Sequence, residues 1–520
     1  MRVPVNYKMY LFVSIVLYCL FSGCLMAQSA DRPNIVLIMA DDVGYSDIGC
    51  YGSEIQTPNL DRLAEGGMRF RQFYNMAKCN PSRSTLFTGL FKGNNRAQSM
   101  GQLMGKAGYS TIMCGKEHFD KWVPERCMPN QSFQYSFWYH LINDFFVPES
   151  GEYKYPFHLG GRELKVADIN AQLKPLYKTD FVTDYALAFL DTVCQHSKPF
   201  FLYLPYNASH YPLQARDEDI QKYKGKYRKG WDVIREERFK KQKAIGIVEE
   251  DCRLSPPEGN INRFRGHPKD NLERRKLIPL YRQWNTLSEK EKDELDLEMA
   301  VFAAMVDRLD QNIGRVLDKL EEQGKLDNTL VMFLSDNGSC PYDSNRDFDI
   351  PPGPRGSYRT LCAGWANAGN TPFRYFKQYG HEGGANTPFI AYWPKKIKQG
   401  TITNETGHIA DILPTLLDVG KGSYPKVCEG EKTPVLDGES LMPIFLQGKR
   451  KGEHFFISGM EKFRMIRWNN WKLVRVNNEE GRLYNIQEDP TELNDVANKY
   501  PEIVEKIKNR YQKWQEKVKQ

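Results

Sequence analysis

The chain has 520 residues, of which 26% are charged and 41% hydrophobic, and its formal net charge is +7. This composition is typical of a soluble globular protein, and without low-complexity tracts or internal repeats it excludes a fibrous or largely disordered chain. No basic stripe is interleaved with aromatic residues, so we expect no nucleic-acid partner; a solvated surface, or attraction to an anionic polymer, explains the small positive charge.

The N-terminus has the layout of a signal peptide. Arg2 and Lys8 precede an apolar run over residues 9–21, and small residues follow. The run is short for a membrane span, so we assign residues 1–27 to a signal peptide and expect an exported protein, periplasmic or on the cell surface. A short membrane anchor is the alternative, and the box ending at Cys24 resembles a bacterial lipoprotein cleavage site.

Strand and helix patterns alternate through most of the chain. Continuous apolar runs of strand length cover residues 33–40, 200–204, 329–334 and 389–393, and helical patterns cover 57–66, 82–88, 180–195 and a long segment from 288. Ser288 and Glu291 have the spacing of a capping box. Apolar runs between helices indicate an α/β domain with a mostly parallel central sheet flanked by helices, and we assign residues 32–437 to it.

The pattern changes from about residue 438. Short strands are predicted over residues 454–458, 464–468, 471–476 and 483–486, with a hairpin turn at Asn469 and Asn470, and a Lys-rich helix over 502–518. We therefore expect residues 438–520 to form a small α+β domain with an antiparallel sheet. The eleven cysteines show no CxxC spacing, so the sequence predicts no disulfide framework.

Two predicted strands end in acidic or amide residues. Asp41 and Asp42 follow the first strand, and Asp336 and Asn337 follow the strand over residues 329–334. Ligands in open α/β sheets bind beyond the carboxyl ends of the strands, and an all-oxygen set favours Ca²⁺ or Mg²⁺. Either pair alone is more often a turn former or a helix cap. Zinc would call for histidines beside these acids, and the strand ends contain none.

Basic residues accompany other predicted ends. Lys116 and His118 are two residues apart, so in an extended segment they project from one face. His210 lies just past the strand over residues 200–204, and Lys377 lies five residues before Glu382. Each could equally be an ordinary surface or structural residue.

Cys79 precedes a predicted helix start. Pro81 suits the first turn of that helix and Gly89 its end, which places the cysteine where backbone N–H groups favour an anion. Arg83, one turn on, can reach the same group. The segment therefore looks like an anion pocket containing a nucleophile, although no general base stands beside the sulfur.

These residues resemble the type I sulfatases of the alkaline phosphatase superfamily. Cys79-Asn-Pro-Ser-Arg83 followed by Thr88-Gly89 is similar to the signature C-x-P-S-R-x(4)-T-G, and residues 108–118 are similar to G-Y-x-T-x(3)-G-K-x-H. Residues 231–235 and 364–373 look most like the bacterial arylsulfatase branch. The resemblance implies that Cys79 is oxidised to Cα-formylglycine by a formylglycine-generating or anaerobic sulfatase-maturating enzyme.

The resemblance also implies the roles of the other residues. One Ca²⁺ would be bound by Asp41, Asp42, Asp336, Asn337 and the modified residue 79. Arg83, Lys116 and Lys377 would hold the sulfate, His118 would take a proton from the diol form of residue 79, and His210 with Lys377 would protonate the leaving oxygen. Lys116, His210, Lys377 and His381 would contact the substrate, although His381 could instead be a structural histidine.

The sequence thus predicts a sulfatase that hydrolyses sulfate monoesters, with O-sulfated carbohydrate as the expected substrate. Three alternatives are an arylsulfatase of broad specificity, a phosphatase or phosphodiesterase of the same superfamily, and a non-catalytic protein that binds sulfated glycans. Two-zinc relatives with a Ser or Thr nucleophile differ from this chain at Cys79. No stable membrane span is expected beyond the signal peptide or a lipid anchor.

Overall fold

The computed structural model describes residues 32–119, 122–140, 144–148, 156–257, 282–342, 345, 349–459, 464–477 and 479–519. The predicted signal peptide and Cys24 lie outside these residues. Within the described ranges, no helix is both long enough and apolar enough to cross a membrane. The cysteines in the same ranges are all free thiols.

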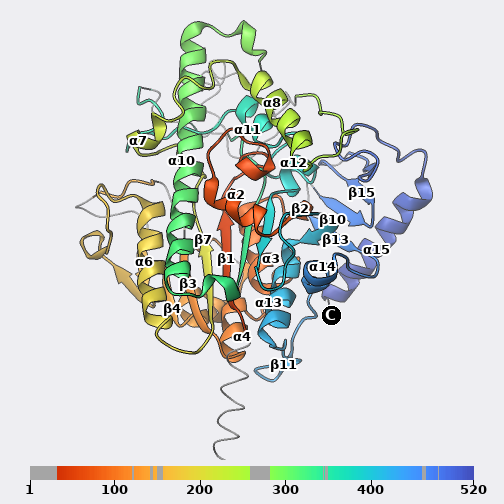
Figure 1. The fold of residues 1–520 in the computed structure, drawn as a ribbon. Helices are drawn as coiled ribbons and strands as arrows, with labels where there is room; N and C mark the ends of the chain where they lie inside the picture. Colours follow the sequence, from red (N-terminus) through yellow and green to blue (C-terminus); the bar gives the residue numbers. More distant parts are fainter. Residues whose placement is uncertain are drawn as a thin grey trace, which may run out of the picture.

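A ten-stranded sheet forms the centre of the molecule, in the order β10-β2-β9-β8-β1-β7-β3-β4-β5-β6 (Figure 1). β8, β1, β7, β3 and β4 run parallel, and β9 enters antiparallel between β2 and β8. The strands are β1 Asn34–Ala40, β2 Met68–Tyr74, β3 Ser110–Lys116, β4 Tyr135–Tyr139, β5 Phe157–Leu159, β6 Arg162–Leu164, β7 Phe200–Pro205, β8 Thr329–Ser335, β9 Phe389–Tyr392 and β10 Thr401–His408.

Helices cover both faces of this sheet, which explains the continuous apolar runs of the central strands. In β1, Val36 and Ile38 belong to one buried cluster, and Ile35 and Leu37 to the cluster on the opposite face. The first face is covered by α2 Pro58–Glu65, α6 Lys178–Val193, α8 Trp231–Ala244, α10 Glu289–Glu322 and α11 Ala363–Gly369. The second is covered by α3 Cys79–Thr88, α4 Met100–Lys106, α13 Ile412–Gly420 and α14 Met442–Gln447. Alternate residues of one strand therefore serve two cores.

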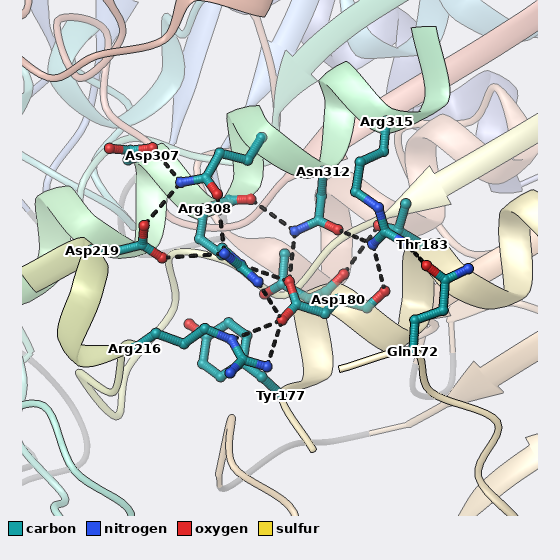
Figure 2. Close-up of polar contacts among 12 residues, drawn as sticks. Gln172, Tyr177, Asp180, Thr183, Arg216, Asp219, Asp307, Arg308, Asn312 and Arg315 are labelled. Atoms are coloured by element: carbon teal, nitrogen blue, oxygen red, sulfur yellow. Dashed lines mark hydrogen bonds and ion pairs between the residues drawn. The ribbon is translucent and has the colours of Figure 1, made fainter. Parts of the chain in front are cut away.

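A buried polar cluster attaches α10 to α6 and to the short helix α7 Asp217–Ile220 (Figure 2). The Asp180 carboxylate of α6 accepts hydrogen bonds from Arg308 Nε at 2.7 Å, Asn312 Nδ2 at 2.9 Å and Arg216 Nε at 2.9 Å. Because two donors come from α10 and the third from Arg216, just before α7, the cluster fixes the long helix against the first face of the sheet.

The C-terminal part forms a second, smaller sheet beside the large one (Figure 1). Its antiparallel strands are β13 Phe455–Ser458, β14 Met465–Trp468, β15 Trp471–Val474 and β16 Arg482–Asn485, and α15 Pro501–Lys519 packs against them. α14, by contrast, contributes Ile444 and Phe445 to the core of the large sheet. The exact domain boundary at residue 438 stays a prediction.

The predicted fold class is confirmed, together with the four apolar runs, the Ser288 capping box and the four C-terminal strands. Two details differ. The helix expected over residues 82–88 begins at Cys79, and the extended segment expected to reach His118 ends at Lys116. His118 has φ of 52°, so it turns out of the strand direction.

Candidate active site

Four neighbouring parallel strands end at one edge of the sheet and bring the predicted site residues together. β8 leads into Asp336 and Asn337, β1 leads into Asp41 and Asp42, and β3 ends in Lys116. His210 follows β7, which lies between β1 and β3. The expectation that separate strand ends face one site is therefore met in the geometry.

Arg83 and Lys116 neutralise the carboxylates of β1 and β8. Lys116 Nζ lies 2.5 Å from Asp41 Oδ2, and Arg83 Nε lies 2.8 Å from Asp336 Oδ2. Arg83 Nη2 is also 3.3 Å from Asp41 Oδ2, and all four side chains are buried. Burial alone would raise the pKa of Asp41, but Lys116 and Arg83 hold it well below its usual range. Asp41 is thus kept ionised.

Asp42 is held by a second pair of donors. Lys377 Nζ lies 2.5 Å from Asp42 Oδ1, and Asn337 Nδ2 donates to the same oxygen at 2.6 Å. Asp42 has φ of 63°, which turns its carboxylate away from the course of β1. Lys377 comes from a loop more than three hundred residues along the chain, and it also lies 5.4 Å from the centre of the Tyr342 ring. The fold therefore brings to Asp42 a lysine that is distant in sequence, and local sequence alone does not assemble the site.

Cys79 is the first residue of α3 and has an exposed fraction of 4%. Lys78 precedes it in extended conformation and offers no side-chain cap, so the first N–H groups of the helix remain available to an anion. Burial raises the pKa of the Cys79 thiol, against the opposing effect of Lys377 and Lys116. The sulfur is therefore a neutral, buried thiol, which is a poor nucleophile as it stands.

His210 presents its Nε2 atom to the carboxylates. Its Nδ1 lies 2.6 Å from the Tyr211 carbonyl, which can only accept, so Nδ1 carries the hydrogen. Burial lowers the pKa of His210 to about 4 although Asp42 and Asp41 oppose this, so the ring is neutral and Nε2 has a lone pair. That lone pair lies 3.7 Å from Asp42 Oδ2. Two acceptors that face each other need a proton or a cation between them.

The oxygen atoms at this edge fit a bound cation. Asp41 Oδ1, Asp42 Oδ2 and Asn337 Oδ1 are buried and have no hydrogen-bond partner in the described part of the chain. Such orphaned acceptors are rare in folded proteins unless a ligand satisfies them. Ligand atoms of Asp41, Asp42 and His210 lie within 4.8 Å of one another. The sequence-based argument that no histidine stands beside the acids is therefore wrong in three dimensions, although oxygens still dominate the set.

Asp336 is placed differently from the other expected ligands. One of its oxygens pairs with Arg83, and the other accepts from the Asp42 N–H at 3.3 Å. Its carboxylate thus links α3 to the end of β1.

A histidine that sequence reasoning did not single out as a site residue lies next to His118. The His118 and His140 rings are 6.0 Å apart, and His140 pairs through Nδ1 with the buried Glu117 carboxylate. The His118 Nδ1 atom has no hydrogen-bond partner among the described residues, and burial lowers its pKa, so this ring is neutral. His140 could have been found from its position directly after β4, at the same edge of the sheet.

His381 lies in different surroundings from the other predicted substrate contacts. It is buried, and its ring centre lies 4.2 Å from that of Tyr375 and 6.3 Å from that of Tyr484 in the C-terminal sheet. Burial lowers its pKa well below the usual range. Contact between His381 and a substrate stays a prediction.

An open α/β sheet with buried lysines, carboxylates and a helix N-terminus at its strand ends defines an enzyme for an anionic substrate, and comparison with known proteins makes this class specific. The sulfatase family profile matches residues 33–423, and that of the N-sulphoglucosamine sulphohydrolase C-terminal domain matches residues 372–517. The chain belongs to the sulfatase family, and we conclude that it is a sulfatase.

Several relatives align over most of their length. An uncharacterised sulfatase of Schizosaccharomyces pombe is 31% identical over 92% of this chain and 92% of its own. An arylsulfatase of Klebsiella aerogenes is 29% identical over 82% of this chain and 94% of its own. An N-acetylglucosamine-6-O-sulfatase of Bacteroides thetaiotaomicron is 26% identical over 95% and 87%, respectively.

Solved structures share the fold. A sulfatase from Pseudoalteromonas sp. superposes with a TM-score of 0.62 at 21% identity, covering 99% of this chain and 95% of its own. A phosphonate monoester hydrolase of Agrobacterium radiobacter superposes with a TM-score of 0.54 at 18% identity, covering 94% and 95%. The fold alone thus also occurs in a protein that is named for another ester.

Proposed function

We propose that this sulfatase hydrolyses sulfate monoesters of carbohydrates, using a Cα-formylglycine made from Cys79 and one bound Ca²⁺. The observation that carries the proposal is the position of Cys79 at the start of α3, where Lys377 and Lys116 act electrostatically on its side chain. A carbohydrate substrate is supported by the Bacteroides relative, whose name specifies a sulfated amino sugar.

Modification of Cys79 accounts for the missing base. When hydrated, formylglycine supplies an oxygen nucleophile and a second hydroxyl for release of the sulfate group. Because Cys79 is buried in the folded chain, the maturating enzyme must act before folding is complete. Pro81 and Arg83 would then serve twice, first as part of the segment read by that enzyme and afterwards in the finished site.

The cation would be held by Asp41, Asp42, Asn337 and Asp336, with the Nε2 atom of His210 beside them. When bound, Ca²⁺ would neutralise charge and lower the pKa of the nucleophilic oxygen. The orphaned oxygens described above are of the type that Ca²⁺ prefers. Asp336 would act mainly by fixing Arg83, since both of its oxygens already have partners in the described chain.

The charge balance of the site suits an anion. The carboxylates of Asp41, Asp42 and Asp336 are matched by Lys116, Arg83 and Lys377, so an added dication leaves an excess of positive charge. Lys116 and Lys377 donate to the sulfate oxygens, and Arg83 stabilises the charge that develops during transfer. A buried setting strengthens each of these interactions.

Two histidines handle protons. His118, neutral and with an unpartnered Nδ1, accepts a proton when the sulfate group is released. Lys377, which lies against Asp42, supplies the proton to the leaving oxygen, and His210 beside the same carboxylate shares this role only once its Nε2 carries a hydrogen.

We also propose that the chain is exported, with residues 1–27 as its signal peptide.

Release of sulfate from singly sulfated sugars tests the proposal. Protein matured by co-expression with a maturating enzyme should release sulfate from at least one sulfated hexose or hexosamine faster than from an aryl sulfate. The Cys79→Ala variant should release sulfate from none of them. A phenyl monoester of a phosphonic acid serves as the control, because the fold also occurs in a phosphonate monoester hydrolase. Hydrolysis of the phosphonate without release of sulfate would contradict the proposal.

A further inference from the structure

A cavity of about 150 Å³ lies away from the residues just described, at the far end of α3. Three segments form it: the loop after α3 with Leu90 and Lys92, the segment from Lys432 to Asp437, and the end of α15 with Lys517 and Val518. The ten residues of α3 separate Cys79 from this loop, which corresponds to roughly 15 Å. The cavity is therefore a separate site.

Cations line the cavity. Lys92, Arg96, Lys432 and Lys517 surround it, and Asp437 is its one acidic lining residue. The exposed ammonium groups of Lys92, Lys432 and Lys517 make no ion pair or hydrogen bond within the described ranges. Like charges from distant segments repel one another, and Asp437, which Lys517 attracts, offsets only part of this repulsion. Such an arrangement suits an external anion.

The wall of the cavity is partly apolar. Leu90, Pro434, Val435 and Val518 contribute to the lining, and Val435 is 62% exposed, one of the few large hydrophobic side chains that the described surface leaves so open. Apolar carbon between cations matches a sugar ring, whose faces carry C–H groups while its edges carry charged substituents. A simple inorganic anion would gain nothing from the valine.

The cavity is built by the fold. The Asp437 carboxylate accepts from the Phe91 N–H at 2.9 Å and from the Trp514 indole N–H at 3.0 Å. One side chain therefore joins the loop after α3 to α15. The Asp437 N–H donates to the Gly89 carbonyl at 3.0 Å, which fixes the segment from Lys432 to Asp437 to the end of α3. Preorganised walls reduce the entropy that binding would otherwise lose.

We infer that this cavity is a second binding site for a sulfated polysaccharide, distinct from the site around Cys79. It would hold one sulfated sugar of a chain, with its sulfate groups against Lys92, Lys432 and Lys517 and its ring against Val435. The inference deepens the proposed function, because it concerns the same substrate class. Such a site would retain a polymer while its sulfate esters are cleaved elsewhere.

Binding of dextran sulfate to the Cys79→Ala protein tests the inference without turnover. The triple variant Lys92→Gln, Lys432→Gln and Lys517→Gln should bind about tenfold more weakly and with a smaller dependence on salt. Its matched control replaces the exposed Lys240, Lys395 and Lys398 by Gln, which removes the same charge elsewhere on the surface. Unsulfated dextran of equal length should bind to neither variant.

Several results would overturn the inference. One is an equal loss of affinity in the control variant, which would show that net charge alone attracts the polymer. Another is an unchanged affinity of the triple variant with an unchanged unfolding midpoint. A loss of the same size for polyphosphate, a DNA duplex or phosphatidylserine vesicles would reject a sulfated sugar as the ligand. Sulfate release by the unsubstituted chain tests the proposed function separately.

Discussion

Replacing Lys472 by methionine removes the one ammonium group from a buried charge cluster between the two sheets. Lys472 Nζ, from β15, lies 2.5 Å from Glu382 Oε1 and 2.9 Å from Glu492 Oε1. All three side chains are buried, and Glu382 begins α12 Glu382–Ala385, shortly after Lys377 in the chain. The Glu382 N–H donates to Glu492 Oε2 at 2.8 Å. The cluster therefore links the small sheet to the segment that carries a site residue.

The expected loss can be derived from burial. Without Lys472, two carboxylates remain in the interior, and breaking a buried pair in this way destabilises a protein by about 3–5 kcal/mol. Burial raises the pKa of Glu492 to about 7, with Glu382 adding to the shift and Lys472 opposing it. Without the opposing effect of Lys472, the pKa of the Glu492 carboxyl rises further in the variant, so the folded state holds a proton that the unfolded state releases. The variant's stability should therefore fall more steeply from pH 6 to pH 8 than that of the parent protein.

Urea unfolding followed by tryptophan fluorescence at pH 6 and pH 8 measures both effects. The matched control adds Glu382→Gln and Glu492→Gln to Lys472→Met, which removes every charge of the trio and should restore most of the lost free energy. A free energy of unfolding within about 1 kcal/mol of the parent at pH 8 would refute the reasoning. So would a triple variant that is no more stable than the single one.

Three further predictions concern Glu298, the cation and Lys116. Burial raises the pKa of Glu298 to about 7, so its folded form keeps a proton that the unfolded chain loses above about pH 4.5, and stability should fall by about 3 kcal/mol as pH rises through this window. Glu298→Gln keeps an acceptor for the Cys362 N–H and should abolish that slope in pH-dependent urea unfolding; an unchanged slope would assign it to other groups. Elemental analysis of dialysed protein should find calcium in preference to zinc, and Asp42→Asn should lose it; stoichiometric zinc would identify the metal as the wrong one. Lys116→Met should lower kcat/KM for a sulfate ester by about 10²–10³, whereas Lys395→Met should leave it unchanged, and equal effects would remove Lys116 from the site.

Much of the fold follows from local sequence because its signals are local. The run at Ile35–Met39 in β1 is apolar throughout because helices cover both faces, and the capping box at Ser288 needs only its own residues. Strands β2, β4, β5, β6 and β10 were not predicted; in β5 and β6, at one end of the sheet, three residues carry too little periodicity.

The site was predictable where it depends on strand ends. Asp41 and Asp336 meet because parallel neighbours end at one edge of the sheet. The pairing of Lys377 with Asp42 and the approach of Tyr342 depend on loop conformation and on contacts across hundreds of residues. The resemblance to the sulfatase family identified Lys377 as a site residue. It did not identify Tyr342 or the Glu117–His140 pair.

The central claim is that Cys79 is the precursor of the nucleophile and not a thiol in the working enzyme. Mass spectrometry of the tryptic peptide from Cys79 to Arg83, prepared from protein that releases sulfate, tests it most directly. We expect the mass of the formylglycine form, in a fraction that rises in proportion to specific activity across preparations with different degrees of maturation. A fully active preparation in which residue 79 is an unmodified cysteine would contradict the account.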